Sequence, residues 1–118
     1  MAKTSASEFA IALESLRLPT KKQLKALRIH YGARKRTVTF NGLAKLMGYK
    51  RHGGINLLYG GLAGRLEEEL DAPRQDPKLL LLVELGKTST EHTMKMRPEF
   101  VNGLKQLGCL NGVRTPKR

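Results

Sequence analysis

Several features that would decide the class of this protein are scarce or missing in its 118 residues. The chain has no tryptophan and a single cysteine, Cys109, so it cannot form an internal disulfide and suits a reducing compartment. Its longest apolar run, 79–83, has only the length of a strand, which excludes a membrane-spanning helix. The first residues contain no apolar segment of the secretory kind. We therefore expect a cytoplasmic protein.

Acidic residues are missing from a long central block. Residues 15–66 hold twelve lysines and arginines and no aspartate or glutamate, whereas elsewhere ten basic and ten acidic residues cancel. The whole net charge of +12 therefore lies in that block. Charge carried for solubility alone would be scattered, and its concentration causes self-repulsion, so a polyanionic partner explains the block better. Nucleic acid is favoured over a membrane surface, because no helix pairs a basic face with a strong aromatic face.

Groups that perform catalysis are also sparse. The three histidines and Cys109 match no zinc-binding spacing, so we expect neither a metal nor a cofactor. The most enzyme-like set is Asp76, Glu84 and Lys87, which resembles the acids and lysine of metal nucleases. Two residues separate Glu84 from Lys87, and on a strand this spacing sends the side chains to opposite faces. The sequence therefore predicts a binding protein and not an enzyme.

Capping residues and apolar periodicity predict most of the helices. Residues 5–8 and 20–23 each match a capping box, in which side chains at the first and fourth positions bond the backbone of a helix start. Pro98 suits the first turn of a last helix. A short helix between them is expected to be capped by Asn41 and to end at Gly48.

A long helix and a hairpin complete the predicted elements. Leucines at helical spacing predict an amphipathic helix from Gly54, with residues 67–69, three glutamates, on its outer face. Residues 78–86 are expected to form a buried strand and residues 93–96 a second one, joined as a β-hairpin.

The predicted fold class is therefore α+β and mostly α, with about five helices and a small β-hairpin. We expect one DNA-binding domain at residues 1–110, because the length is that of a single domain and no internal repeat occurs. Residues 111–118 are basic and are expected to form a disordered tail.

One interpretation of the basic half is a winged helix-turn-helix. Thr39, Leu43 and Gly48 match the generic pattern of a first helix and tight turn, and the hairpin would act as a wing. This predicts a regulator that binds unmodified DNA. Against it, a recognition helix normally presents polar side chains to base edges, whereas this second helix offers only Asn56 and, later, Arg65.

Another interpretation rests on residues 30–66, HYGARKRTVTFNGLAKLMGYKRHGGINLLYGGLAGRL. The elements His30-Tyr31, Gly48-Tyr49 and, most specifically, Asn56-x-x-Tyr59-Gly60 make this run resemble the DNA sulfur-binding domain family. The resemblance implies a reader of phosphorothioate DNA, in which sulfur replaces a non-bridging phosphate oxygen, as in type IV restriction systems. Many relatives also carry an HNH nuclease domain, whose residues do not occur in this sequence.

The resemblance implies that the loop before the long helix accepts the sulfur atom. Sulfur is larger, softer and less strongly hydrated than oxygen, so a shallow apolar pocket flanked by basic residues prefers it. The implied pocket residues are Arg51, His52, Gly53, Gly54 and Ile55.

Other polar and basic residues are implied to hold the remaining DNA backbone. These DNA-binding residues are His30, Tyr31, Arg34, Lys35, Arg36, Lys50 and Asn56. Structural alternatives stay open for several positions: His30 as a buried histidine, Asn56 as a brace of the turn, and Tyr59 as a core residue. The expected partner is double-stranded DNA with phosphorothioate linkages. A third hypothesis is a basic subunit that recruits a separate nuclease through its more acidic C-terminal half.

Overall fold

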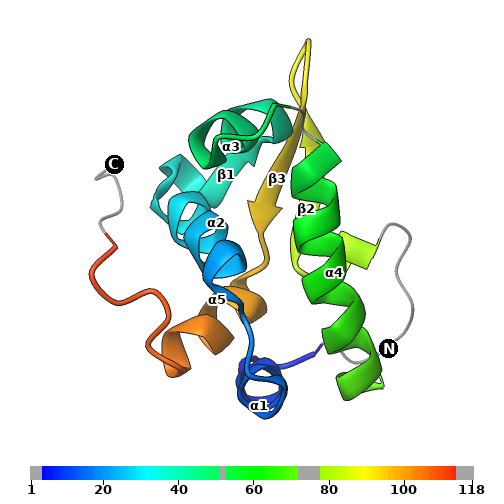
Figure 1. Cartoon of the computed structure of the whole chain (residues 1–118), viewed down its shortest axis with the longest axis vertical. Coiled ribbons are helices and arrows are strands. Elements are labelled where there is room, and N and C mark those ends of the chain that lie inside the picture. Colours follow the sequence, from blue (N-terminus) through cyan, green and yellow to red (C-terminus); the bar gives the residue numbers. More distant parts are fainter. Residues whose placement is uncertain (1–3, 51–52, 72–77, 114–118) are drawn as a thin grey trace.

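Five α-helices and three short strands make up the described part of the chain, residues 4–50, 53–71 and 78–113 of a computed structural model (Figure 1). The predicted α+β, mostly α class is confirmed. The helices are α1 (Ala6–Leu16), α2 (Lys21–Gly32), α3 (Phe40–Met47), α4 (Gly53–Leu70) and α5 (Pro98–Gln106). The strands are β1 (Thr37–Thr39), β2 (Val83–Lys87) and β3 (His92–Met96), and two 3₁₀ turns are η1 (Arg34–Arg36) and η2 (Lys78–Leu81).

Local sequence signals fix several helix ends. Both predicted capping boxes, at residues 5–8 and 20–23, are formed with their two reciprocal side-chain bonds. Pro98 stands at the start of α5, as predicted. Gly48 ends α3 in the left-handed conformation, with φ of 77°, which a residue without Cβ adopts at little cost.

The cap of α3 differs from the prediction. Its N-cap is Thr39, whose hydroxyl accepts a hydrogen bond from the backbone N–H of Gly42 at 2.9 Å. Thr39 takes this role because it closes β1 in the extended conformation that an N-cap requires. Asn41 lies inside the first turn instead, and its amide donates to a carboxylate oxygen of Glu91 at 2.9 Å. That bond ties α3 to the turn of the hairpin.

The strands form one antiparallel sheet in the order β1-β3-β2. The β2–β3 hairpin confirms the prediction, and β1 adds a third strand, with Thr37 opposite Lys95 and Thr39 opposite Thr93. The expected strand at residues 78–86 is wrong in its first half, which forms η2. A strand would send alternate leucines of this run to opposite faces, whereas the turn lets Leu79, Leu81 and Leu82 all enter the core.

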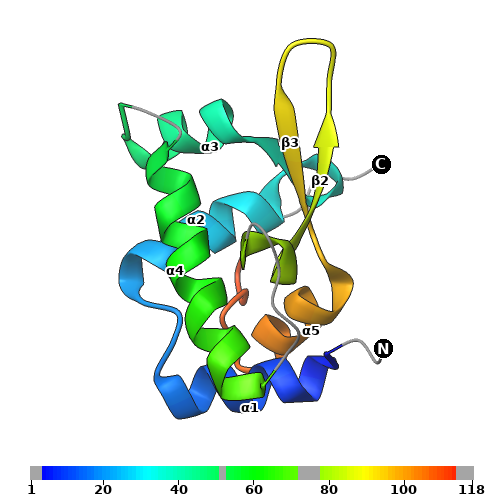
Figure 2. The ribbon, with the colours of Figure 1, turned by 90° about the vertical axis from the view of Figure 1, so that its right-hand side faces the viewer.

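The helices pack around a continuous apolar core. Helix α4 runs along one side of the molecule, and the hairpin projects beyond α3 (Figures 1 and 2). Helices α1 and α5 pack closely, with the Phe9 and Phe100 rings edge to face at 5.4 Å. Gly103 permits this approach, because a Cβ there would lie 2.7 Å from the Cβ of Phe9. The core thus joins the N-terminal helix to the last one.

Two surface predictions are corrected or extended. Glu67 is buried, at 6% exposure, whereas Glu68 and Glu69 are exposed. Consecutive helical residues are 100° apart, so three of them cannot all share one outer face.

Near the C-terminus, the Arg28 guanidinium donates to the carbonyl oxygens of Cys109 and Asn111, both at 2.9 Å. The packed chain therefore reaches into the expected tail 111–118, of which 114–118 lie outside the described residues.

Candidate nucleic-acid interface

Three cations occupy a tight reversal between α2 and β1, which we call the basic turn (Arg34, Lys35 and Arg36). The turn closes through a hydrogen bond from the Thr37 N–H to the Arg34 carbonyl. Lys35 and Arg36 have φ of 55° and 53°, so two adjacent side-chain-bearing residues sit in the left-handed region. Each costs about 1 kcal/mol relative to ordinary backbone. The result is an exposed pair, Arg34 and Lys35, beside a half-buried Arg36.

The Tyr31 ring packs against the basic turn. The Arg36 Cζ lies 5.0 Å from the centre of the Tyr31 ring, within the range of a cation–π contact. A second cation, the Nζ of Lys105 in α5, lies 5.5 Å from the same ring centre. Only 9% of Tyr31 is exposed. The structure thus brings together four of the predicted DNA-binding residues, and it adds Lys105, which the sequence did not indicate.

His30 is fully buried, so its side chain is not available for direct contact with DNA. Its Nε2 lies 2.9 Å from the Met94 carbonyl oxygen, which only accepts, so Nε2 carries the proton and donates. Nδ1 then accepts from the Tyr59 hydroxyl at 2.9 Å. Burial lowers the pKa of His30 to about 4 and raises that of Tyr59, so both are neutral at physiological pH. The buried-histidine alternative describes His30, and Tyr59 is a core residue.

The start of α4 is bare and apolar, and we call residues 48–50 and 53–57 the glycine-rich lip. A Cβ on Gly54 would lie 2.9 Å from the Tyr49 ring, so this glycine makes room for Tyr49. Among the described residues, a Cβ on Gly53 would meet no atom within 4 Å, which leaves this backbone open on that side. The side chains of Lys50 and Asn56 are exposed.

The apolar side chain at the lip is not the predicted one. Ile55 is fully buried on the α4 stripe with Tyr59 and Leu62, so it does not line a surface pocket. The exposed one is Leu57, at 80%. The sequence could have indicated this residue, because Leu57 does not fall on the helical repeat of the buried stripe and occupies a position where a polar residue is normal. Arg51 and His52, the other predicted pocket residues, lie outside the described residues.

The basic turn and the lip are held apart. Figure 2 shows α3 running between them, with the basic turn at the β1 end and the start of α4 at the other. Exposed Lys45 and Leu46 lie on α3 itself. The sequence-predicted site is therefore two separate patches on one side of the molecule, joined by α3, and only an extended ligand contacts both.

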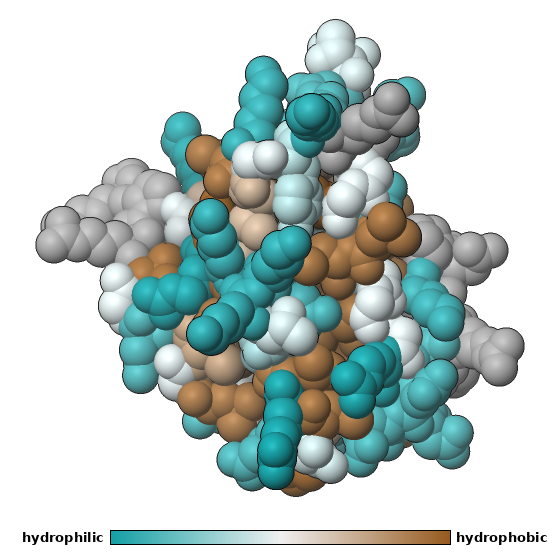
Figure 3. Space-filling model, in the orientation of Figure 1, coloured by the Kyte–Doolittle hydropathy of each residue, from teal (hydrophilic) through white to brown (hydrophobic). Residues whose placement is uncertain are grey.

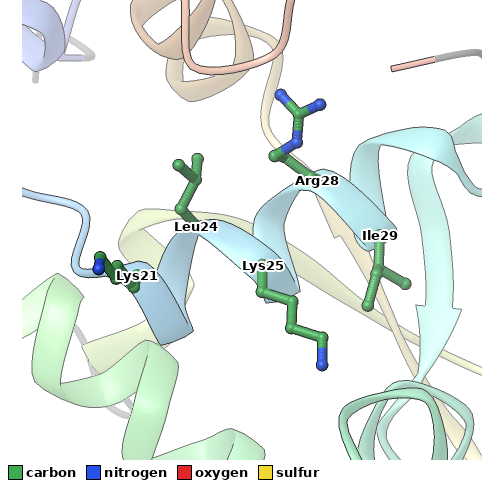
Figure 4. Close-up of a pocket in the computed structure, with 5 residues that line it drawn as sticks. All are labelled: Lys21, Leu24, Lys25, Arg28 and Ile29. Carbon is green, nitrogen blue, oxygen red and sulfur yellow. The ribbon is translucent and has the colours of Figure 1, made fainter. Parts of the chain in front are cut away.

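A shallow hollow of about 430 Å³ lies along α2. Figure 4 shows its lining residues, Lys21, Leu24, Lys25, Arg28 and Ile29. Figure 3 shows the same mixture over this face, where hydrophilic side chains border apolar surface. Arg28 is committed to the two C-terminal carbonyls, and both lysines are exposed. The hollow offers aliphatic surface and two exposed lysines. This combination suits weak contact with an anionic ligand but gives no specificity for a particular one.

Groups for metal or covalent chemistry are not assembled in the described part of the chain. No three His, Cys, Asp or Glu side chains in residues 4–50, 53–71 and 78–113 are placed to hold a metal ion. Glu84, from the nuclease-like set, lies 3.7 Å from the Arg97 guanidinium. Burial raises the pKa of the Cys109 thiol, the opposite of what a reactive cysteine needs.

Among the described helices, none has the length and apolar content to cross a membrane. No protein-family model, curated protein or solved structure matches the chain.

Proposed function

We propose that this protein binds double-stranded DNA across the basic turn, α3 and the glycine-rich lip, and that it prefers DNA carrying a phosphorothioate linkage. The main support for DNA binding comes from the basic turn. Within the described residues, Arg34, Lys35 and Arg36 have no carboxylate partner, and the backbone of Lys35 and Arg36 is left-handed. Uncompensated cations on a fixed, strained turn suit contact with phosphates.

The lip supports the preference for sulfur. An open glycine backbone at Gly53 and an exposed leucine at Leu57 offer apolar contact to a weakly hydrated anionic atom. An oxygen anion at the same place would lose water without compensation. Leu57 takes the role that the sequence assigned to Ile55. The resemblance of residues 30–66 to DNA sulfur-binding domains adds to this argument.

A second candidate, a winged helix-turn-helix regulator of unmodified DNA, is favoured by one observation. Helices α3 and α4 follow one another in the chain, and the hairpin projects beside them (Figure 2). The bond from Asn41 to Glu91 fixes the hairpin relative to α3. This arrangement suits a wing that contacts DNA next to the helices. The two candidates share an interface and differ in whether the sulfur matters. Recruitment of a separate nuclease stays a prediction.

Two duplexes of one sequence, with and without a single phosphorothioate, test the proposal at fixed salt. Each phosphorus diastereomer is measured separately by fluorescence anisotropy. We expect one diastereomer to bind about tenfold more tightly than the unmodified duplex. Leu57→Ser should narrow that ratio, whereas Leu85→Ser, which changes another exposed leucine in β2, should not. Equal Kd values for all duplexes would contradict the sulfur preference and favour the regulator. Failure to bind any duplex would contradict DNA binding itself.

A further inference from the structure

Two cations from distant parts of the chain meet over one tyrosine ring. Arg36 belongs to the basic turn, whereas Lys105 lies in α5, outside the acid-free block. Their charged groups lie 5.0 Å and 5.5 Å from the Tyr31 ring centre. In both ribbon views α5 lies on the β1 side of the molecule, away from α4 (Figures 1 and 2). The cluster thus extends the basic surface from the basic turn into the C-terminal half.

The two positive charges of this pair lack a neutralising carboxylate among the described residues. The face of the ring attracts each cation, and because both lie within 5.5 Å of its centre, the two positive charges are close enough to repel each other across the ring. In residues 4–50, 53–71 and 78–113, neither cation lies within ion-pair distance of a carboxylate. The backbone of Arg36 also has a left-handed φ of 53°. An anion shared by the two cations would remove the repulsion and offset the strain.

We propose that Arg36 and Lys105 form a seat for one phosphodiester group of bound DNA, with Tyr31 as the residue that positions both cations. This inference rests on the proposed DNA-binding function. The shared ligand is a phosphodiester because DNA presents one at every step along a backbone that passes over the basic turn. Lys105 is partly held by the ring before binding, so less side-chain freedom is lost when the phosphate arrives.

The test compares Lys105→Gln with Lys78→Gln, a matched change at an exposed lysine of η2 that lies against α4. DNA affinity is measured by anisotropy at several salt concentrations, and folding is checked by thermal melting. Lys105→Gln should weaken binding of modified and unmodified duplexes equally, about three- to tenfold, and reduce the slope of log K against log salt by about 0.9. Lys78→Gln should change neither quantity. If the two variants share the wild-type slope, the seat is wrong, while binding by the wild type keeps the proposed function.

Variants of Tyr31 separate positioning from simple packing. Tyr31→Phe keeps the aromatic face and should keep the affinity and the salt slope. Tyr31→Leu removes the ring and should reproduce the loss seen in Lys105→Gln, and adding Lys105→Gln to it should cause little further loss. Full additivity of the two changes would overturn the role given to the ring. Inorganic phosphate is titrated as a third arm. Saturable phosphate binding that Lys105→Gln abolishes, with DNA affinity and salt slope unchanged in that variant, would assign the seat to free phosphate and overturn its assignment to DNA.

Discussion

The basic turn and the glycine-rich lip lie at opposite ends of α3 and present opposite kinds of surface. At the basic turn the side chains are long and charged, and the backbone of Lys35 and Arg36 is left-handed. At the lip most side chains are small or apolar, with Lys50 and Asn56 as the exposed polar ones, and the backbone from Gly53 onward is helical. A concentration of charge can therefore be located by counting residues in the sequence, whereas an apolar surface depends on which way a helix is turned.

The largest expected effect separates core from surface within the lip. Ile55→Ala should lower the free energy of unfolding by about 2–5 kcal/mol, because Ile55 is fully buried and its truncation leaves a cavity. Leu57→Ala should change it by less than about 0.5 kcal/mol, because that side chain is in water. Urea unfolding measures both. Similar losses for the two variants would contradict the orientation of α4 and, with it, the role given to Leu57.

The next effect concerns the buried pair that links the two regions, His30 from α2 and Tyr59 from α4. His30 titrates near pH 6.5 when unfolded and near pH 4 when folded, so only the unfolded chain binds this proton between those values. The free energy of unfolding should therefore fall by up to about 3 kcal/mol from this group as the pH falls from 6.5 to 4. His30→Gln should remove that part of the slope in urea titrations, whereas His92→Gln, at an exposed position, should keep it. An unchanged slope in His30→Gln would contradict burial of a neutral imidazole.

The smallest expected effects come from one substitution in each region that changes the conformational freedom of the backbone. Lys35→Gly relieves a left-handed residue, and Gly53→Ala adds a methyl group in open space, so each should raise the free energy of unfolding by about 0.5–1 kcal/mol. Both should weaken DNA binding, the first by losing a cation and the second by obstructing the approach of the backbone. Thermal melting and anisotropy measure the two quantities. Greater stability with unchanged affinity would place the altered region outside the interface.

Local features of the fold could be predicted from the sequence because their causes are local. The capping boxes at residues 5–8 and 20–23 involve partners three positions apart, and Gly48 ends α3 by its own conformation. The choice of Thr39 over Asn41 as a cap is different. Both are good capping residues, and the choice depends on β1, which is extended because it pairs with β3.

The candidate site was predicted only where charge defines it. The basic turn follows from three adjacent cations, whereas Lys105 joins it through a contact with Tyr31 that no local pattern contains. His30 and Ile55 were expected to face the ligand, and the structure buries both. Their sequence neighbourhood is basic, but burial is decided by which side of α2 and α4 each residue occupies. The amino-acid composition of a segment does not determine which side of a helix faces the core.

The three-residue strand β1 sets an order on how this protein becomes functional as it is synthesised. Its sheet partner is β3, which lies on the far side of α3, α4 and the hairpin turn in the chain. The acid-free block therefore leaves the ribosome before the segment that shapes its basic turn. A nascent chain that stops before residue 92 has the charge for DNA but not the sheet that fixes Thr37 and the turn before it. The basic turn thus takes its final shape only after the C-terminal half has folded against it.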